Sequence, residues 1–245
     1  MGTVKENGII IKQNDYGEGH RRLSIFTENH GIISAVNYGA KRQKNKSAAL
    51  SQLLCFGEFE LYMSNRDYAS INSINVTEAF LPVTEDIKKL SLCTYFMDIT
   101  YAMLGENNPD ARLLKTLLNI IYALAYRDEP IEKVKAVYEL RLMTLGGYMP
   151  NLNSCACGKN IVEMFDFDKG SIVCNECRGG SAVKISAGVY KAMSYITQAD
   201  DKRLLSFTGN DALFDELGKI TEKYLLTHID RKFSSLDYYK MMKDM

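Results

Sequence analysis

The sequence has neither a net charge nor a long apolar run, and each absence excludes a class of protein. Among 245 residues, 30 basic side chains balance 30 acidic ones, so the overall charge indicates no particular partner. No stretch of 18 consecutive apolar residues occurs, and the opening segment MGTVKENGII has no apolar run of signal-peptide length. We therefore expect a cytoplasmic protein with reduced thiols, neither secreted nor inserted in a membrane.

The motifs of common enzyme classes are missing as well. The sequence contains no P-loop, no G-x-G-x-x-G, no H-E-x-x-H and no G-x-S-x-G. Its three histidines are scattered, at His20, His30 and His228. Four acidic residues lie in loop-like segments, where we expect solvated carboxylates: Asp166, Asp168, Asp200 and Asp201. The sequence therefore predicts a protein that is not an enzyme and has no catalytic residues.

Residues 1–80 are predicted to form a small β domain. Five runs rich in β-branched and aromatic residues are separated by turn signals such as Asn29-His30-Gly31: Gly8–Gln13, His20–Glu28, Gly31–Gly39, Phe56–Ser64 and Tyr68–Phe80. The alternation is clearest in the fourth run, where Phe59, Leu61 and Met63 are predicted to face one side. A short helix from Ser47 to Leu54 is expected between the third and fourth runs. This order is that of an OB-fold barrel, although other small barrels share it.

Beyond residue 80 the apolar spacing changes to three or four residues, which is typical of helices. Thr84 is expected to cap the first helix, and two more helices are expected to begin at Pro109 and Pro130. Two later helices are expected over Ser186–Gln198 and Asn210–His228. Arg141 lies in the apolar stretch ELRLMTL. It is either a buried arginine whose hydrogen bonds are satisfied within the chain or a group that holds a partner's carboxylate. Arg127 is a second candidate for contact with a partner.

The predicted fold class is α+β with several domains, an N-terminal OB-fold β-barrel followed by an all-α domain that carries a zinc-binding loop insertion. The expected boundaries are 1–80 for the nucleic-acid-binding OB-fold, 81–150 and 183–245 for the two parts of the helical domain, and 151–182 for a four-cysteine zinc segment.

Four of the six cysteines lie in the segment NSCACGKNIVEMFDFDKGSIVCNECRGG. Cys174 and Cys177 have the C-x₂-C spacing at which two thiolates converge on one tetrahedral zinc ion, whereas Cys155 and Cys157 are one residue closer. Sixteen residues, polar and loop-like, separate the pairs, near the spacing of four-cysteine zinc sites. Free buried cysteines or a redox pair are the alternatives. Because four thiolates saturate zinc, we expect one structural ion per chain and not a catalytic one.

A basic stretch lies before the fourth run. No acidic residue occurs from position 29 to position 57, and four basic residues fall within six positions: Lys41, Arg42, Lys44 and Lys46. Three more basic residues lie on or near neighbouring strands: Lys12, Arg21 and Arg22. Three nearby aromatic residues could stack on bases: Tyr16, Phe26 and Tyr38. The alternative is a solvated loop beside core aromatics, but on an OB-fold barrel we expect these basic residues to bind DNA.

Several segments, taken in order, resemble the RecO family of bacterial recombination mediators. They are DYGEGHRRLSIFTENHGIISAVNYGAKRQKNKSAALSQLLCFGEFEL, YELRLMTLGGYMPNLNSCACG, CNEC and RKFSSLDYY, and the resemblance covers almost the full length. The chain departs from the family's zinc-binding members in its first cysteine pair, which is C-x-C where they commonly have C-x₂-C.

The resemblance implies a function as well as a fold. It implies a non-enzymatic, nucleoid-associated protein of recombinational DNA repair with an OB-fold, a helical domain and a zinc segment. Such proteins bind single- and double-stranded DNA, anneal complementary strands and contact the C-terminal tail of single-stranded-DNA-binding protein. With RecR they help load the RecA recombinase. The alternatives from other classes are a zinc-dependent nuclease or hydrolase and a protein-only adaptor.

Overall fold

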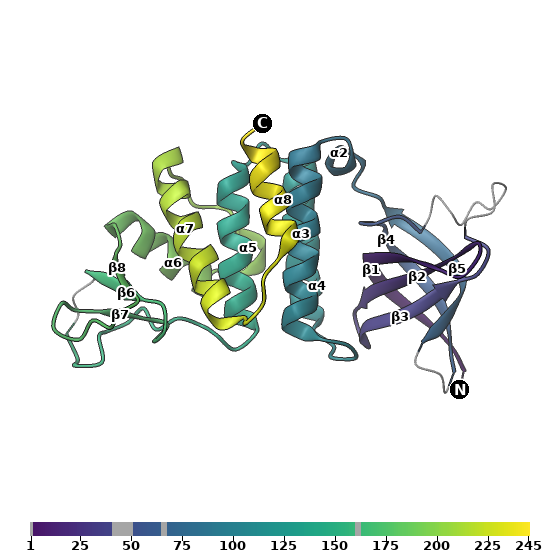
Figure 1. Ribbon diagram of the computed structural model, residues 1–245, viewed down its shortest axis with the longest axis horizontal. Helices are drawn as coiled ribbons and strands as arrows, with labels where there is room; N and C mark the ends of the chain where they lie inside the picture. The colour runs from purple at the N-terminus through teal and green to yellow at the C-terminus, as the bar shows by residue number, and fades with distance from the viewer. Residues whose placement is uncertain (1, 41–50, 65–67, 160–162) are drawn as a thin grey trace. The chain divides into compact units, whose positions relative to one another are not determined.

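The computed structural model describes residues 2–40, 51–64, 68–159 and 163–245 (Figure 1). A sheet-rich region at the N-terminal side is followed by helices, as the sequence predicts. The chain forms two compact units, one of Met1–Ala125 with Ser235–Met245 and one of Tyr126–Ser234. Each unit buries an apolar core of its own.

Five strands of the first unit close into a barrel, drawn in purple to blue in Figure 1. They are β1 (Gly2–Tyr16), β2 (His20–Thr27), β3 (Gly31–Asn37), β4 (Phe56–Met63) and β5 (Ala69–Glu78). Their order is β1-β2-β3-β5-β4, and β4 pairs back onto β1. The pairing of β3 with β5 is parallel, and it brings the start of β5 beside the end of β3.

The barrel interior is filled by alternate side chains. Phe59 and Leu61 are fully buried and Met63 packs against the same cluster, which confirms the alternation predicted for this strand. Three consecutive isoleucines of β1 are buried, Ile9, Ile10 and Ile11, and the pairing of β1 with β2 shifts register between Ile10 and Lys12. The predicted helix from Ser47 lies largely outside the described residues, and residues 51–54 form turns.

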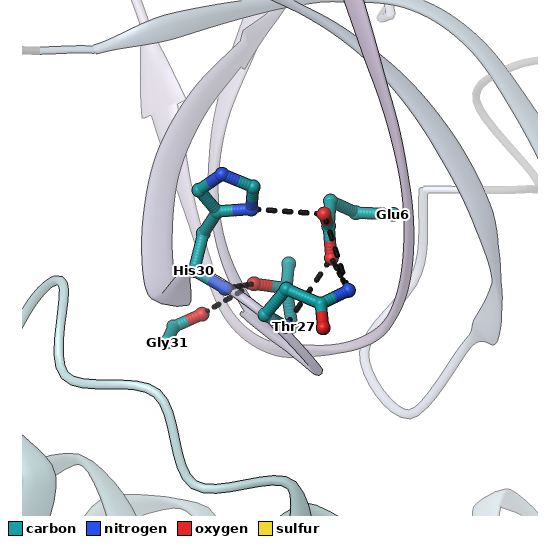
Figure 2. A network of polar contacts seen from close by, with 5 residues as sticks. Glu6, Thr27, His30 and Gly31 are labelled. Atoms are coloured by element: carbon teal, nitrogen blue, oxygen red, sulfur yellow. Dashed lines mark hydrogen bonds and ion pairs between the residues drawn. The ribbon is translucent and has the colours of Figure 1, made fainter.

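The predicted turn at Asn29-His30-Gly31 joins β2 to β3 and is held by a buried carboxylate (Figure 2). Glu6 is 5% exposed, and it accepts hydrogen bonds from the backbone nitrogen of Asn29 at 3.4 Å and from Asn29 Nδ2 at 3.2 Å. Its Oε1 lies 2.8 Å from His30 Nδ1. Thr27 Oγ1 donates to the Gly31 carbonyl oxygen at 2.8 Å. Side chains therefore fix this turn to β1 in addition to the strand ladder.

Gly31 is required at this turn by its backbone and by its neighbour. Its φ of +68° lies in the left-handed region, and a Cβ there would lie 2.5 Å from backbone atoms of Asn108. Beside it, the Asn107 nitrogen donates to the Ile32 carbonyl oxygen at 3.2 Å. The loop at residues 105–110 consequently packs directly on the end of the barrel.

Among the described residues, four helices accompany the barrel: α2 (Leu81–Thr84), α3 (Ile87–Leu104), α4 (Ala111–Tyr126) and α8 (Ser234–Lys243). The predicted cap of the long helix is wrong, because Asp86 caps α3 in place of Thr84. Asp86 Oδ1 accepts from the backbone nitrogens of Lys88 and Lys89 at 2.9 and 3.1 Å. Thr84 ends α2, where its hydroxyl donates to the Leu81 carbonyl oxygen. A carboxylate that reaches two free amides at the helix start is the better cap.

Three long helices build the second unit: α5 (Ile131–Leu145), α6 (Ala187–Gln198) and α7 (Asp211–His228). The predicted start of α5 is confirmed, since the helix follows Pro130, and it ends at Leu145 with Gly146 as its C-cap. Ser186 and Asn210 cap α6 and α7 through their side-chain oxygens. Within the described residues, no helix combines the length and apolar character that crossing a membrane requires.

Helix α5 carries a buried arginine. Arg141 is 1% exposed, and its Nη1 donates to the carbonyl oxygens of Ile196 and Thr197 at 3.2 and 3.3 Å. Its Nη2 lies 2.7 Å from Asp201 Oδ1. The structure therefore supports the interpretation of Arg141 as a buried, paired group that holds the end of α6. The expectation of a solvated Asp201 is wrong, because that carboxylate pairs with the guanidinium.

The cysteine segment forms a small sheet where the sequence predicts a loop. Strands β6 (Met164–Asp166), β7 (Ser171–Val173) and β8 (Ala182–Lys184) pair antiparallel in the order β7-β6-β8. Strands of three residues are too short to show an alternating pattern in the sequence. We call residues 151–159 and 163–184 the cysteine module.

Candidate nucleic-acid interface and cysteine centre

Aromatic side chains meet where β1 ends and β5 begins. Tyr16 is the cross-strand partner of His20 in the β1–β2 hairpin. The Tyr16 and Tyr68 rings pack edge to face with centroids 5.8 Å apart, and their hydroxyl oxygens lie 3.1 Å apart. This hydrogen bond to Tyr68 is the main cause that raises the pKa of the Tyr16 hydroxyl. The two phenols therefore orient each other.

Cationic and aromatic neighbours extend this pair along the barrel surface. The Arg22 guanidinium carbon lies 5.4 Å from the Tyr68 ring centre, and its Nε donates to Ser34 Oγ at 2.8 Å. The His20 ring packs edge to face on Tyr38 at 5.1 Å. His20 Nδ1 accepts from the Gly39 backbone nitrogen at 2.8 Å, which leaves Nε2 as the protonated nitrogen of a neutral ring.

We call this continuous group the aromatic strip: Tyr16, His20, Arg22, Tyr38 and Tyr68. Tyr38 is 48% exposed, and the other four side chains are partly exposed. Exposed rings held at fixed angles can stack on unpaired bases, and a guanidinium among them can contact phosphate or stack as well. In the sequence, Tyr38 of the strip lies shortly before residues 41–50, and Tyr68 directly follows residues 65–67.

The predicted basic residues have different surroundings. Arg22 lies in the aromatic strip, and Arg21 lies opposite Asp15 and Asn37 in the ladders. Lys12 is exposed on β1, with its Nζ 5.5 Å from the ring centre of Tyr101 on α3. The four residues of the basic loop lie outside the described residues: Lys41, Arg42, Lys44 and Lys46.

The aromatic predictions need one correction and two additions. Phe26 is fully buried and offers no stacking face. His20 and Tyr68 were not among the predicted stacking residues. The sequence carries no signal for Tyr68, since only the parallel β3–β5 pairing brings it to this surface.

Four cysteine sulfurs converge in the cysteine module. The Sγ atoms of Cys155, Cys157, Cys174 and Cys177 all lie within 4.8 Å of one another, a group that could hold a metal ion. Zn–S bonds of about 2.3 Å place tetrahedral sulfurs about 3.8 Å apart, and the Cys157 and Cys174 sulfurs are 3.8 Å apart. The shortened C-x-C pair therefore still brings both of its sulfurs to the cluster.

Backbone amides surround the first pair. The amides of Cys157 and Cys174 point at the Cys155 sulfur, and these donors lower its pKa to about 6. Gly158, with φ of +80°, turns back so that its nitrogen donates to the Cys155 carbonyl oxygen at 2.8 Å. The neighbouring sulfurs of Cys155, Cys157 and Cys174 instead favour the protonated form of Cys177 and raise its pKa to about 12. Four neighbouring thiols cannot all ionise alone, whereas a bound cation would compensate four thiolates.

The remaining cysteines lie apart from this cluster. Cys55 is buried in the barrel and Cys93 in α3, and burial raises the pKa of both thiols. Both therefore behave as structural, unreactive cysteines.

One predicted solvated carboxylate is a buried part of the cysteine module. Asp166 is 1% exposed, which corrects the expectation, whereas Asp168 is exposed as expected. Burial alone would raise its pKa, but hydrogen bonds from Ser181, Gly179 and Lys169 outweigh it and hold the pKa below its usual value. The carboxylate is therefore ionised and saturated with donors.

Comparisons with known proteins agree along the whole chain. The family model described as Recombination protein O N terminal matches residues 1–80, and Recombination protein O C terminal matches residues 84–237. A DNA repair protein RecO of Acetivibrio thermocellus is 35% identical over 247 residues, covering 99% of this chain and 98% of that protein. Another, of Alkaliphilus metalliredigens, is 28% identical and covers 97% and 98%. The chain therefore belongs to the Recombination protein O family.

Proposed function

We propose that the chain is a DNA-binding recombination mediator of recombinational DNA repair. Its membership of a family whose relatives carry the name DNA repair protein RecO supports this role. In this proposal it binds single- and double-stranded DNA, anneals complementary strands and contacts the C-terminal tail of single-stranded-DNA-binding protein. With RecR it helps load RecA onto DNA coated by that protein. No catalytic residue takes part.

The aromatic strip is the observation that carries the proposal. It combines exposed rings and a guanidinium on the surface of a small barrel. The strand order β1-β2-β3-β5-β4 with a parallel β3–β5 pair supports an OB-fold for residues 1–80. We also propose, as expected from the sequence, that residues 81–150 and 183–245 form the two parts of the helical domain and that residues 151–182 form the zinc segment.

Annealing breaks no covalent bond, so positioning and charge are sufficient. Arg21, Arg22, Lys12 and the basic loop would neutralise phosphates and so reduce the repulsion between two approaching strands. Rings of the aromatic strip would hold bases by their faces. A base held by its face keeps its pairing edge available to a complementary strand.

We also propose that the four cysteines hold one structural zinc ion. The support is the convergence of four sulfurs and the amide donors around Cys155. When bound, zinc supplies a tetrahedral cross-link between the two cysteine pairs. Because the four thiolates would saturate it, the ion takes no part in DNA chemistry.

A DNA-binding titration over a salt series tests the DNA-binding proposal. If Lys41, Arg42, Lys44 and Lys46 contact single-strand phosphates, log K should fall against log salt with a slope near −3 from these four contacts. Replacing all four by Ala should remove that part of the slope for every sequence. An unchanged slope would exclude the basic loop from the interface.

The aromatic strip is tested separately with a single substitution. Tyr68→Leu should weaken single-strand binding roughly tenfold by loss of stacking while leaving the salt slope unchanged. Tyr238→Leu, which changes an exposed tyrosine of α8 that is 43% exposed, is the matched control and should bind as wild type. Equal affinity of the Tyr68→Leu protein and the control would contradict a stacking role.

Two other functions predict different results. A zinc-dependent nuclease or hydrolase would degrade DNA with turnover that Cys174→Ala abolishes without unfolding the chain. A protein-only adaptor would bind its partners tightly with no salt-sensitive affinity for DNA.

A further inference from the structure

We propose that Asp166 is a positioning residue for the metal site, which orders the chain leaving the second cysteine pair so that Cys177 reaches the ion. The inference deepens the zinc assignment made above and rests on it. Asp166 is the last residue of β6 and lies among neither cysteine pair.

The carboxylate connects three segments that surround the CNEC turn. Its Oδ2 accepts from the Gly179 backbone nitrogen at 2.8 Å, two residues after Cys177. Its Oδ1 accepts from Ser181 Oγ at 2.8 Å and from the Lys169 backbone nitrogen at 3.2 Å. One buried side chain thus ties the exit of the second pair to both the central strand and the β6–β7 turn.

Two further observations point to the same role. A Cβ on Gly179 would lie 2.5 Å from Asp166 Oδ2, so the close approach of the carboxylate requires glycine there. Lys169 Nζ lies 3.8 Å from Asp166 Oδ2 and also donates to the Cys177 carbonyl oxygen at 2.8 Å. The backbone of Cys177 is therefore held directly by Lys169 and indirectly by Asp166.

Cys177 needs this support more than the two buried ligands, Cys155 and Cys174, do. Cys155 and Cys174 are 2% and 3% exposed and lie within the small apolar core of the cysteine module, whereas Cys177 is only partly buried at its margin. Without Asp166, the segment from residue 178 to residue 181 would lose its anchor. Part of the free energy of zinc binding would then be consumed in ordering Cys177. Outer groups that orient metal ligands typically change affinity 10- to 100-fold when they are removed.

Competition between the full chain and a chromophoric zinc chelator tests the proposal. Asp166→Asn keeps the size of the side chain but replaces an oxygen acceptor by a donor, and we expect zinc affinity to fall at least about tenfold. Asp168→Asn, an exposed carboxylate two residues away, is the matched control. Thr221→Val removes a hydroxyl that donates to Glu139 at 2.7 Å in the same unit, and it controls for general destabilisation. Both controls should bind zinc within about twofold of wild type.

Cobalt substitution gives a readout that general stability does not move. Cobalt bound by tetrahedral thiolates has charge-transfer and ligand-field absorption bands. The intensity of these bands for each bound ion should change in Asp166→Asn and should equal that of the wild type in both controls. If Asp166→Asn fails to fold, Ser181→Ala, which removes one partner of Oδ1, should still weaken zinc binding about fivefold.

The outcomes separate this inference from the zinc assignment. Suppose that the wild-type protein binds about one zinc ion and that the zinc affinity of Asp166→Asn is within twofold of the wild-type value. This result would overturn the role of Asp166 and leave the zinc assignment intact. Wild-type protein that binds no zinc would overturn both. An equal loss of zinc affinity in Asp166→Asn and Thr221→Val would also overturn the role of Asp166, since general instability would then explain the effect.

Discussion

The aromatic strip and the cysteine module both gather reactive side chains, but they present them in opposite ways. In the strip, rings and a guanidinium lie on an already closed barrel, and Tyr38 leaves nearly half of its surface in solvent. In the cysteine module the sulfurs face one another, within 4.8 Å, and two of them are almost completely buried. The first arrangement suits a ligand that arrives from solution, whereas the second suits an ion that remains in place.

The two regions also differ in what holds them together. The barrel encloses a large apolar cluster that includes Phe59, Leu61 and Ile10. The sulfurs lie in a small buried cluster of Cys155, Met164, Val173 and Cys174, and Phe165, Phe167 and Ile172 of the same module are buried as well. Strands of three residues cannot bury enough apolar surface for independent stability, so a small sheet of this kind depends on a cross-link. If the four cysteines hold a metal ion as proposed, that ion also stabilises the fold of the cysteine module, whereas the barrel has a large apolar core of its own.

The largest expected effect follows from removing one cysteine. Cys174→Ser should abolish zinc binding, and amide protection of β6, β7 and β8 should fall by on the order of 100-fold or more, because binding energy of the ion contributes to folding. Hydrogen exchange measured by mass spectrometry checks this, and the barrel amides should be unchanged. Glu176→Gln, an exposed residue inside the CNEC turn, is the control. Full protection of the small sheet in Cys174→Ser would contradict the dependence on a cross-link.

An intermediate effect is expected in the barrel, where a polar clamp supports an apolar core. Glu6→Ala removes the buried acceptor of Asn29 and His30, and it should lower the free energy of unfolding by about 2 kcal/mol. Denaturant titration followed by barrel signals checks this. Glu58→Ala, on the exposed Lys5–Glu58 pair at 3.4 Å, should cost less than about 0.5 kcal/mol. Equal costs would mean that the clamp of Figure 2 contributes no more than a surface ion pair.

The smallest effect concerns the contact between the cysteine module and helix α7. Tyr224 donates to the Tyr148 carbonyl oxygen at 2.9 Å and packs on Phe165, and Tyr224→Phe should cost about 1 kcal/mol. Burial raises the pKa of Tyr224 to about 12 from 10.0. Its contribution is therefore complete below pH 10 and is lost as pH rises through about 12.

Thermal unfolding at several pH values checks this prediction. The difference between wild type and Tyr224→Phe should stay constant from about pH 7 to pH 9 and shrink above pH 10. A difference that grows with pH would contradict the assignment of Tyr224 as a buried donor.

Sequence patterns predicted the regular parts of this protein well and the polar interior poorly. Proline at the start of α5 and the alternation of β4 are local signals that the structure confirms. Asp166, expected in solvent, is buried because partners up to 15 residues away enclose it. Asp201 pairs with Arg141, 60 residues distant. No local pattern records such partners.

The sequence by itself determined the order of the elements and the four-cysteine cluster, since periodicity and close spacing are properties of the chain. It also pointed to the barrel as the place for DNA contacts through the charge of residues 29–57. Only the tertiary structure decided which aromatic residues share a surface. Parallel pairing of β3 with β5 brings Tyr68 to Arg22, and the folded chain buries Phe26 completely. Those contacts depend on strand order, which is settled by the packing of the whole barrel.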